Sequence, residues 1–129
     1  MTPILLTGPA LEPVSLEEAK NWLRLDANTE DTLVDALITS ARLRVEAAAG
    51  IQLITQEWRI VMDVWPDTAC LELPTRPVSS VEAIRVFDAQ GTPSTIPAED
   101  YLVDLAGLRS RIFFHSAPVA PAQKVSELA

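Results

Sequence analysis

The sequence predicts an α+β fold, with an N-terminal helical hairpin, a small antiparallel β-sandwich or sheet after it, and a flexible C-terminal tail. Two observations support this prediction. Apolar residues recur with a helical period up to Gly50 and alternate with a period of two after it, which marks a change from helix to strand. Ten prolines divide the 129 residues into a lead-in, a helical part, a strand-rich part and a tail.

The length of the chain fits one domain, since most domains have roughly 100 to 150 residues. We expect an extended lead-in over residues 1–14 and a single domain over residues 15–114. Within that domain the helices occupy residues 15–49 and the strands residues 53–114. Residues 115–129 are rich in proline and small residues and have no clear period, so they form the expected tail.

A short amphipathic helix is expected to begin after Ser15. Ser15 and Glu18 have the spacing of a capping box, in which each side chain accepts a hydrogen bond from the other residue's backbone N–H. Leu16, Ala19 and Leu23 follow at helical spacing. The pattern therefore predicts a helix of about three turns with one apolar face.

A second, longer helix follows, capped by Asn28 or Thr29 and ended by Gly50, which can adopt the left-handed conformation. The short connection predicts that the two helices form a hairpin. The second helix carries a wide apolar stripe: Leu33, Val34, Leu37, Ile38, Ala41, Val45 and Ala48. Such a stripe needs a cover, which comes either from the sheet or from an adjacent subunit.

The strand-rich part opens with a clear alternation, in which Trp58, Ile60, Met62 and Val64 fall on one face. Turn residues then separate several shorter segments of strand character. These segments hold Leu71 with Leu73, residues 81–87, Thr95 with Ile96, and a closing hairpin from Tyr101 to Phe114. Short antiparallel strands at this spacing predict a small sandwich or barrel.

The composition argues against several classes of function. Ten Lys and Arg against eighteen Asp and Glu give a net charge of −8, which is unsuited to a tight grip on nucleic acid. The single Cys70 and single His115 provide no metal-binding set, and no phosphate-binding or nucleophile motif is present. We therefore expect no catalytic residues, no cofactor and no metal. The start of the chain lacks the pattern of a signal peptide, so we expect synthesis in the cytoplasm.

Two arginines near the end of the strand-rich part are candidate binding residues. Arg109 and Arg111 share one face of the last expected strand and form a small positive strip in an acidic chain. Pairing with carboxylates such as Asp104 on the neighbouring strand is the favoured explanation. The functional alternative is contact with an acidic partner.

Several segments together resemble a known family. The segments are EPVSLEEAKNWLRLD, a helix starting TEDTLVDALITSARLRVEAAAG, then LITQEWRIVMDVWP, LPTRPVSSVEAIRVFDAQG and EDYLVD. In this order and spacing they resemble the head-tail connector, or adaptor, family of long-tailed bacteriophages and gene transfer agents. The resemblance runs from about Glu12 to about Phe114.

The resemblance implies a non-enzymatic, homo-oligomeric ring, usually of twelve copies, in the neck of a phage or phage-like particle. Such a ring connects the portal protein to a stopper or tail-completion protein and leaves a channel through which DNA passes without specific binding. Many members continue with further helices, whereas this sequence ends in a Pro/Ala tail. We expect that tail to become ordered on the portal, with Val125 and Leu128 as anchors.

Two alternative functions remain open at the level of sequence. One is a stopper or tail-completion protein of the same neck. The other is a small cytoplasmic enzyme or ligand-binding domain whose site is assembled from scattered residues. A deep pocket with converging polar groups favours that last alternative.

Overall fold

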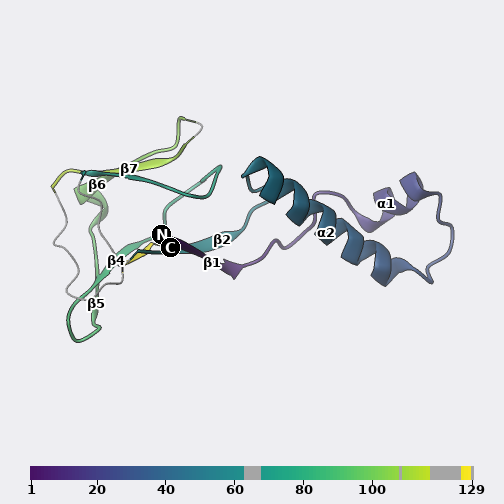
Figure 1. The fold of residues 1–129 in the computed structure, drawn as a ribbon, viewed down its shortest axis with the longest axis horizontal. Helices are drawn as coiled ribbons and strands as arrows, with labels where there is room; N and C mark the ends of the chain where they lie inside the picture. Colours follow the sequence, from purple (N-terminus) through teal and green to yellow (C-terminus); the bar gives the residue numbers. More distant parts are fainter. Residues whose placement is uncertain (63–67, 108, 117–125, 129) are drawn as a thin grey trace. The chain divides into compact units, whose positions relative to one another are not determined.

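The structure is a computed structural model of the 129-residue chain, and it describes residues 1–62, 68–107, 109–116 and 126–128 (Figure 1). The chain divides into two compact units. Residues 8–56 form what we call the helical unit, and residues 1–7 together with 57–129 form the sheet unit. Helices and antiparallel strands are both present, which confirms the predicted α+β class.

The helical unit contains two α-helices, α1 (Leu16–Leu23) and α2 (Asp31–Ala49), which contact each other. The predicted capping box is confirmed. Ser15 Oγ accepts a hydrogen bond from the Glu18 backbone N–H at 3.2 Å, and the Glu18 carboxylate accepts one from the Ser15 N–H at 2.9 Å. The predicted stop is also confirmed, because Gly50 ends α2 in the left-handed conformation with φ 63°.

The predicted cap of α2 is wrong. Glu30 occupies the N-cap position, and its side chain makes no capping hydrogen bond. Asn28 instead accepts a hydrogen bond from Lys20 Nζ at 2.6 Å, and the same ammonium pairs with Asp31 at 2.6 Å. Asn28 therefore helps to join α1 to the start of α2 rather than capping the helix.

The sheet unit consists of two antiparallel sheets. In the larger sheet the strand order is β1-β2-β8-β4-β5, and in the smaller sheet it is β3-β7-β6. A short 3₁₀ helix, η1 (Ala98–Asp100), precedes β6. The strands are β1 (Thr2–Thr7), β2 (Glu57–Met62), β3 (Cys70–Glu72), β4 (Ile84–Phe87), β5 (Pro93–Thr95), β6 (Tyr101–Asp104), β7 (Arg111–Phe114) and β8 (Ser126–Leu128).

The two ends of the chain differ from the sequence-based expectation. Residues 2–7 of the expected lead-in form β1, an edge strand paired with β2. Residues 126–128 of the expected flexible tail form β8, which lies between β2 and β4, with Leu128 opposite both Ile60 and Ile84. The tail prediction is therefore wrong for these three residues. Neither segment has the alternation of a half-buried strand, so the pairing with distant strands defines both of them.

The core of the sheet unit draws on both sheets. Ile84 on β4 and Ile112 on β7 are completely buried, at 0% exposure. The predicted alternation in β2 is confirmed for Ile60 and Met62, whereas Val64 lies outside the described residues. The two sheets thus share one apolar cluster: Ile60, Met62, Leu71, Leu73, Ile84, Ile112 and Phe114.

Neither helix of the described chain combines the length and the apolar character needed to cross a membrane.

Candidate assembly interface

Helix α2 presents two neighbouring ridges of side chains with opposite character. Residues four apart on a helix form a ridge, and a second ridge one residue further along is rotated by about 100°. Val34, Ile38, Arg42 and Glu46 form the inner ridge, in which Val34, Arg42 and Glu46 are buried and Ile38 is half-buried. The inner ridge of α2 is therefore apolar near its start and ionic near its end.

Arg42 is the centre of a buried ionic cluster. It is 8% exposed, and Glu46 one turn later is 7% exposed. Arg42 Nε donates to a Glu12 carboxylate oxygen at 2.7 Å, and one terminal nitrogen donates to Glu46 at 2.8 Å. A buried arginine between two carboxylates satisfies the rule that buried charges are paired and hydrogen-bonded.

The second carboxylate oxygens of Glu12 and Glu46 connect α2 to the segment before α1 and to the segment after α2. The second oxygen of Glu12 accepts from the Thr39 hydroxyl at 2.9 Å, which attaches the segment before α1 to α2. The second oxygen of Glu46 accepts from the Leu53 backbone N–H at 3.0 Å and from Gln56 Nε2 at 2.8 Å. The cluster therefore fixes both the segment that enters the helical unit and the segment that leaves it.

The electrostatics of the cluster favour the charged forms. The hydrogen bond from Arg42 lowers the pKa of Glu12 below its ordinary value of 4.5, against the opposing effect of desolvation. The same hydrogen bond raises the pKa of Arg42. Both groups are therefore charged at neutral pH, and acid weakens the cluster by protonating Glu12.

The outer ridge of α2 is apolar and exposed. It consists of Leu33, Leu37, Ala41 and Val45, and the three large side chains are 57%, 54% and 49% exposed, in that order. Arg44 lies beside this ridge and is exposed. The predicted stripe is thus divided, because its inner edge is buried while its outer part is not covered by any of the residues that the structure describes.

Helix α1 has an exposed aromatic side chain. Trp22 is 87% exposed, the highest value among the exposed large apolar side chains of the described chain. Glu18 lies one turn before Trp22, and both it and Glu17 are exposed. An exposed tryptophan next to carboxylates is typical of an interface anchor, because tryptophan dominates binding energy when it is buried by a partner.

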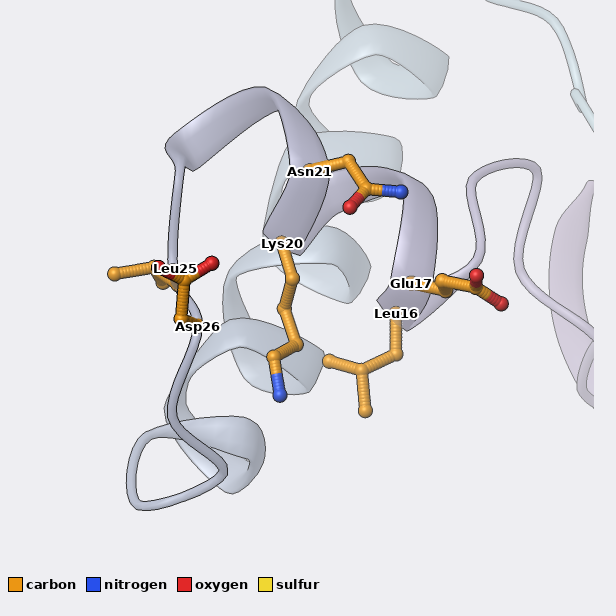
Figure 2. Close-up of a pocket in the computed structure, with 6 residues that line it drawn as sticks. All are labelled: Leu16, Glu17, Lys20, Asn21, Leu25 and Asp26. Carbon is orange, nitrogen blue, oxygen red and sulfur yellow. The ribbon is translucent and has the colours of Figure 1, made fainter.

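A hollow of about 360 Å³ lies against α1 and is shown in Figure 2. Leu16 and Lys20 point to the same side of α1 there, and Glu17 and Asn21 also line the hollow. The Lys20 ammonium is already bonded to Asn28 and Asp31, so the cation that lines this hollow is used within the chain. Within the described residues, no group of three or more His, Cys, Asp or Glu side chains is placed to hold a metal ion.

The candidate binding residues from the sequence do not form one site. Arg111 pairs with Asp104 across β6 and β7 at 2.8 Å and lies 5.2 Å from the centre of the Phe113 ring. Arg109 pairs with Glu72. Both arginines are exposed and paired with carboxylates within the chain. The predicted shared strand face is wrong, because β7 begins at Arg111 and Arg109 lies before it. Their contact with a partner stays a prediction.

The two candidates in the tail have different outcomes. Leu128 belongs to β8 and takes part in the larger sheet through its backbone. Val125 lies outside the described residues. The proposed anchoring of the tail on a partner therefore stays a prediction for both residues.

Comparison with known proteins decides the family. Residues 13–89 match the model of the phage gp6-like head-tail connector protein, and this range is more than half of the chain. The chain belongs to the phage gp6-like head-tail connector family. A search of curated protein sequences gave no match.

Solved structures similar to this connector come from gene transfer agent particles. A chain in the neck of an empty particle, computed with C6 symmetry, has 25% identity and a TM-score of 0.81 over 99% of this connector and 68% of that chain. A chain in the neck of a native particle, computed with C12 symmetry, has 27% identity and a TM-score of 0.69. The match covers 97% of this connector and 66% of that chain. A chain in a native virion has 24% identity and a TM-score of 0.80, and the match covers 99% of this connector and 69% of that chain. The connector thus spans about two thirds of the length of these chains.

Sequence analysis missed two features of this connector. The first is the cluster of Glu12, Arg42 and Glu46, although Arg42 and Glu46 have the i, i+4 spacing of a helical ion pair. The second is the division of the apolar stripe of α2 into a buried inner ridge and an exposed outer ridge. No pattern in the sequence states which of two adjacent ridges faces inward, so the signal for the second feature was absent.

Proposed function

We propose that this connector is the structural head-tail adaptor of a phage or gene transfer agent particle. It forms a ring in the neck between the portal protein and the stopper or tail-completion protein. The observation that carries the proposal is the similarity of 99% of the chain, at 25% identity, to a chain of a gene transfer agent neck. The match to the head-tail connector family over residues 13–89 supports the same role.

The proposed ring contains twelve copies of the chain. The necks that hold the similar chains were computed with C6 and C12 symmetry, and a ring of twelve is compatible with both. A cyclic ring uses two unlike surfaces on each subunit, so that the same contact repeats around the axis. In this proposal the two helices form a hairpin and the strands form a sandwich, and each subunit folds before it joins the ring.

The proposed role is mechanical, and no bond is made or broken. DNA passes through the central channel of the ring. The net charge of −8 supports passage without retention, because a wall with excess carboxylates repels phosphates whereas a basic wall binds them.

Deletion of the gene in cells that produce the particle tests this role. We expect DNA-filled heads without tails, and we expect the wild-type gene supplied on a plasmid to restore tailed particles. Chemical cross-linking of the restored particles, followed by mass spectrometry, is expected to join this chain directly to the portal protein. Normal tailed particles after deletion contradict the proposal. Cross-links to a different adaptor but not to the portal favour the stopper instead.

A further inference from the structure

The outer ridge of α2 is a continuous row of exposed apolar side chains on the helical unit. Leu33, Leu37, Ala41 and Val45 continue along three turns of one helix, with Ala48 beyond them. A continuous exposed apolar ridge is rare on a protein that works as a monomer and marks a surface that a partner covers. Arg42 and Glu46 of the inner ridge are held by the ionic cluster, so α2 cannot turn its outer ridge inward without breaking these hydrogen bonds.

The exposed face of α1 differs from this ridge in chemistry. Trp22 is its most exposed apolar group, and the exposed Glu18 lies one turn before it on the same side of the helix. The ridge of α2 is aliphatic and carries Arg44, for which no carboxylate partner is recorded among the residues that the structure describes. The two faces are thus complementary. The face of α1 presents an aromatic side chain and a carboxylate, and the face of α2 presents an aliphatic ridge and a cation.

We infer that the outer ridge of α2 is the contact surface for the next copy of this chain, which places its Trp22 face against the ridge. The inference rests on the proposed ring. A closed ring requires on each subunit two unlike surfaces that fit each other, and α1 and α2 supply such a pair within one compact unit. The C12 symmetry of a neck with a similar chain supports a second copy as the occupant.

The contact has the anatomy of a specific interface. Trp22 supplies a large rigid anchor, and Leu37 and Val45 supply aliphatic side chains on which an indole ring packs. Arg44 supplies a charge that pairs with the Glu18 carboxylate beside Trp22 and fixes the orientation of the contact. Acidic groups on α2 in place of Arg44 are predicted to repel that face.

Cysteine cross-linking in assembled particles tests the contact. All variants replace the native Cys70 by serine and are supplied to cells that lack the gene. The double variant Trp22→Cys with Leu37→Cys is treated with a short bismaleimide, and the adaptor is analysed on a denaturing gel. We expect a ladder of covalent multimers that extends beyond the dimer, because each subunit links to a neighbour on both sides.

The controls separate this contact from other arrangements. Leu43 is 53% exposed on α2 but lies outside the outer ridge, so Trp22→Cys with Leu43→Cys is expected to give no ladder. Dimers from Leu37→Cys alone overturn the inference, because they require two ridges to face each other. A cross-link from Leu37→Cys to a different protein, or monomers only from the double variant, also overturn it.

A second measurement does not depend on cross-linking. Leu37→Asp is expected to reduce the amount of adaptor per portal in purified particles at least tenfold, while the matched Leu43→Asp leaves it unchanged. Circular dichroism of both purified variants checks that the helices are retained. Incorporation of Leu37→Asp at the wild-type level overturns the inference but leaves the proposed ring intact. Absence of the wild-type chain from the particles contradicts the proposed function itself.

Discussion

The two units of this connector differ in the side chains that they bury, because among the described residues only the helical unit buries an ion pair. The sheet unit encloses an apolar cluster shared by two sheets, with Ile84 and Ile112 fully buried. The helical unit encloses an arginine between two carboxylates on the inner ridge of α2, and leaves the apolar outer ridge exposed. The sheet unit therefore encloses an apolar core, whereas the helical unit leaves a continuous apolar ridge exposed.

This difference indicates that different apolar residues serve the stability of the chain and its proposed assembly. In the sheet unit, apolar side chains stabilise the chain itself. In the helical unit, ionic hydrogen bonds hold the segments in place, and in the contact that we propose the outer apolar side chains are buried only by a second copy. Two substitutions test this difference, one in the apolar core of the sheet unit and one in the ionic cluster of the helical unit.

Truncation of the sheet core has the largest expected effect on stability. Ile112→Ala removes a completely buried side chain and leaves a cavity, so we expect a loss of about 4 kcal/mol in the free energy of unfolding. The matched truncation Leu37→Ala, on an exposed position of α2, is expected to change it by less than about 0.5 kcal/mol. Urea unfolding of the purified chains measures both. Equal losses contradict the division between the two units.

Removal of the central arginine has the next largest effect. Arg42→Met keeps the aliphatic volume but leaves Glu12 and Glu46 without their cation, so we expect a loss of about 2 to 3 kcal/mol. Hydrogen exchange measured by mass spectrometry is expected to show faster exchange in residues 8–56 and unchanged protection in the core strands β2 and β7. Faster exchange in those strands and not in α2 contradicts the assignment of the cluster to the helical unit.

Acid is expected to weaken the helical unit through the same cluster. Because the pKa of Glu12 is lower in the folded chain than its ordinary value of 4.5, its contribution is complete above that pH and is lost as the pH falls through the folded-state pKa. Glu18 and Asp104 also have lowered pKa values, through Ser15 and through Ala106 with Arg111, so part of the acid sensitivity has other sources.

The measurement compares wild type with Glu12→Gln. Helical circular dichroism is followed during thermal unfolding between pH 7 and pH 3. We expect Glu12→Gln to be less stable at pH 7 and to lose less stability on acidification than wild type does. Parallel curves for the two proteins contradict a role for this carboxylate in the acid response.

Local signals in the sequence were sufficient for much of the fold. Ser15 with Glu18 and the stop at Gly50 depend on neighbours within one turn, so their residue types alone predict them. The alternation at Ile60 and Met62 likewise predicts which face of β2 is buried. In each case the sequence signal lies within the segment itself.

Features defined by distant partners could not be predicted. Strand β8 is defined by its antiparallel pairing with β2 and β4, because its three residues have no strand pattern of their own. The inner ridge of α2 is selected by Glu12 and by the Leu53 N–H, which lie before α1 and after α2. Periodicity located the apolar residues of α2 correctly, but the choice between adjacent ridges depends on these long-range hydrogen bonds.

Cryo-electron microscopy of the portal vertex, reconstructed without imposed symmetry, tests the central claim most directly. We expect a closed ring of copies next to the portal in which the outer ridge of each α2 is covered by the Trp22 face of the neighbouring copy. A ring in which that ridge faces solvent or the DNA channel contradicts the assembly role of the helical unit. A neck that contains no copy of this chain contradicts the proposed function as well.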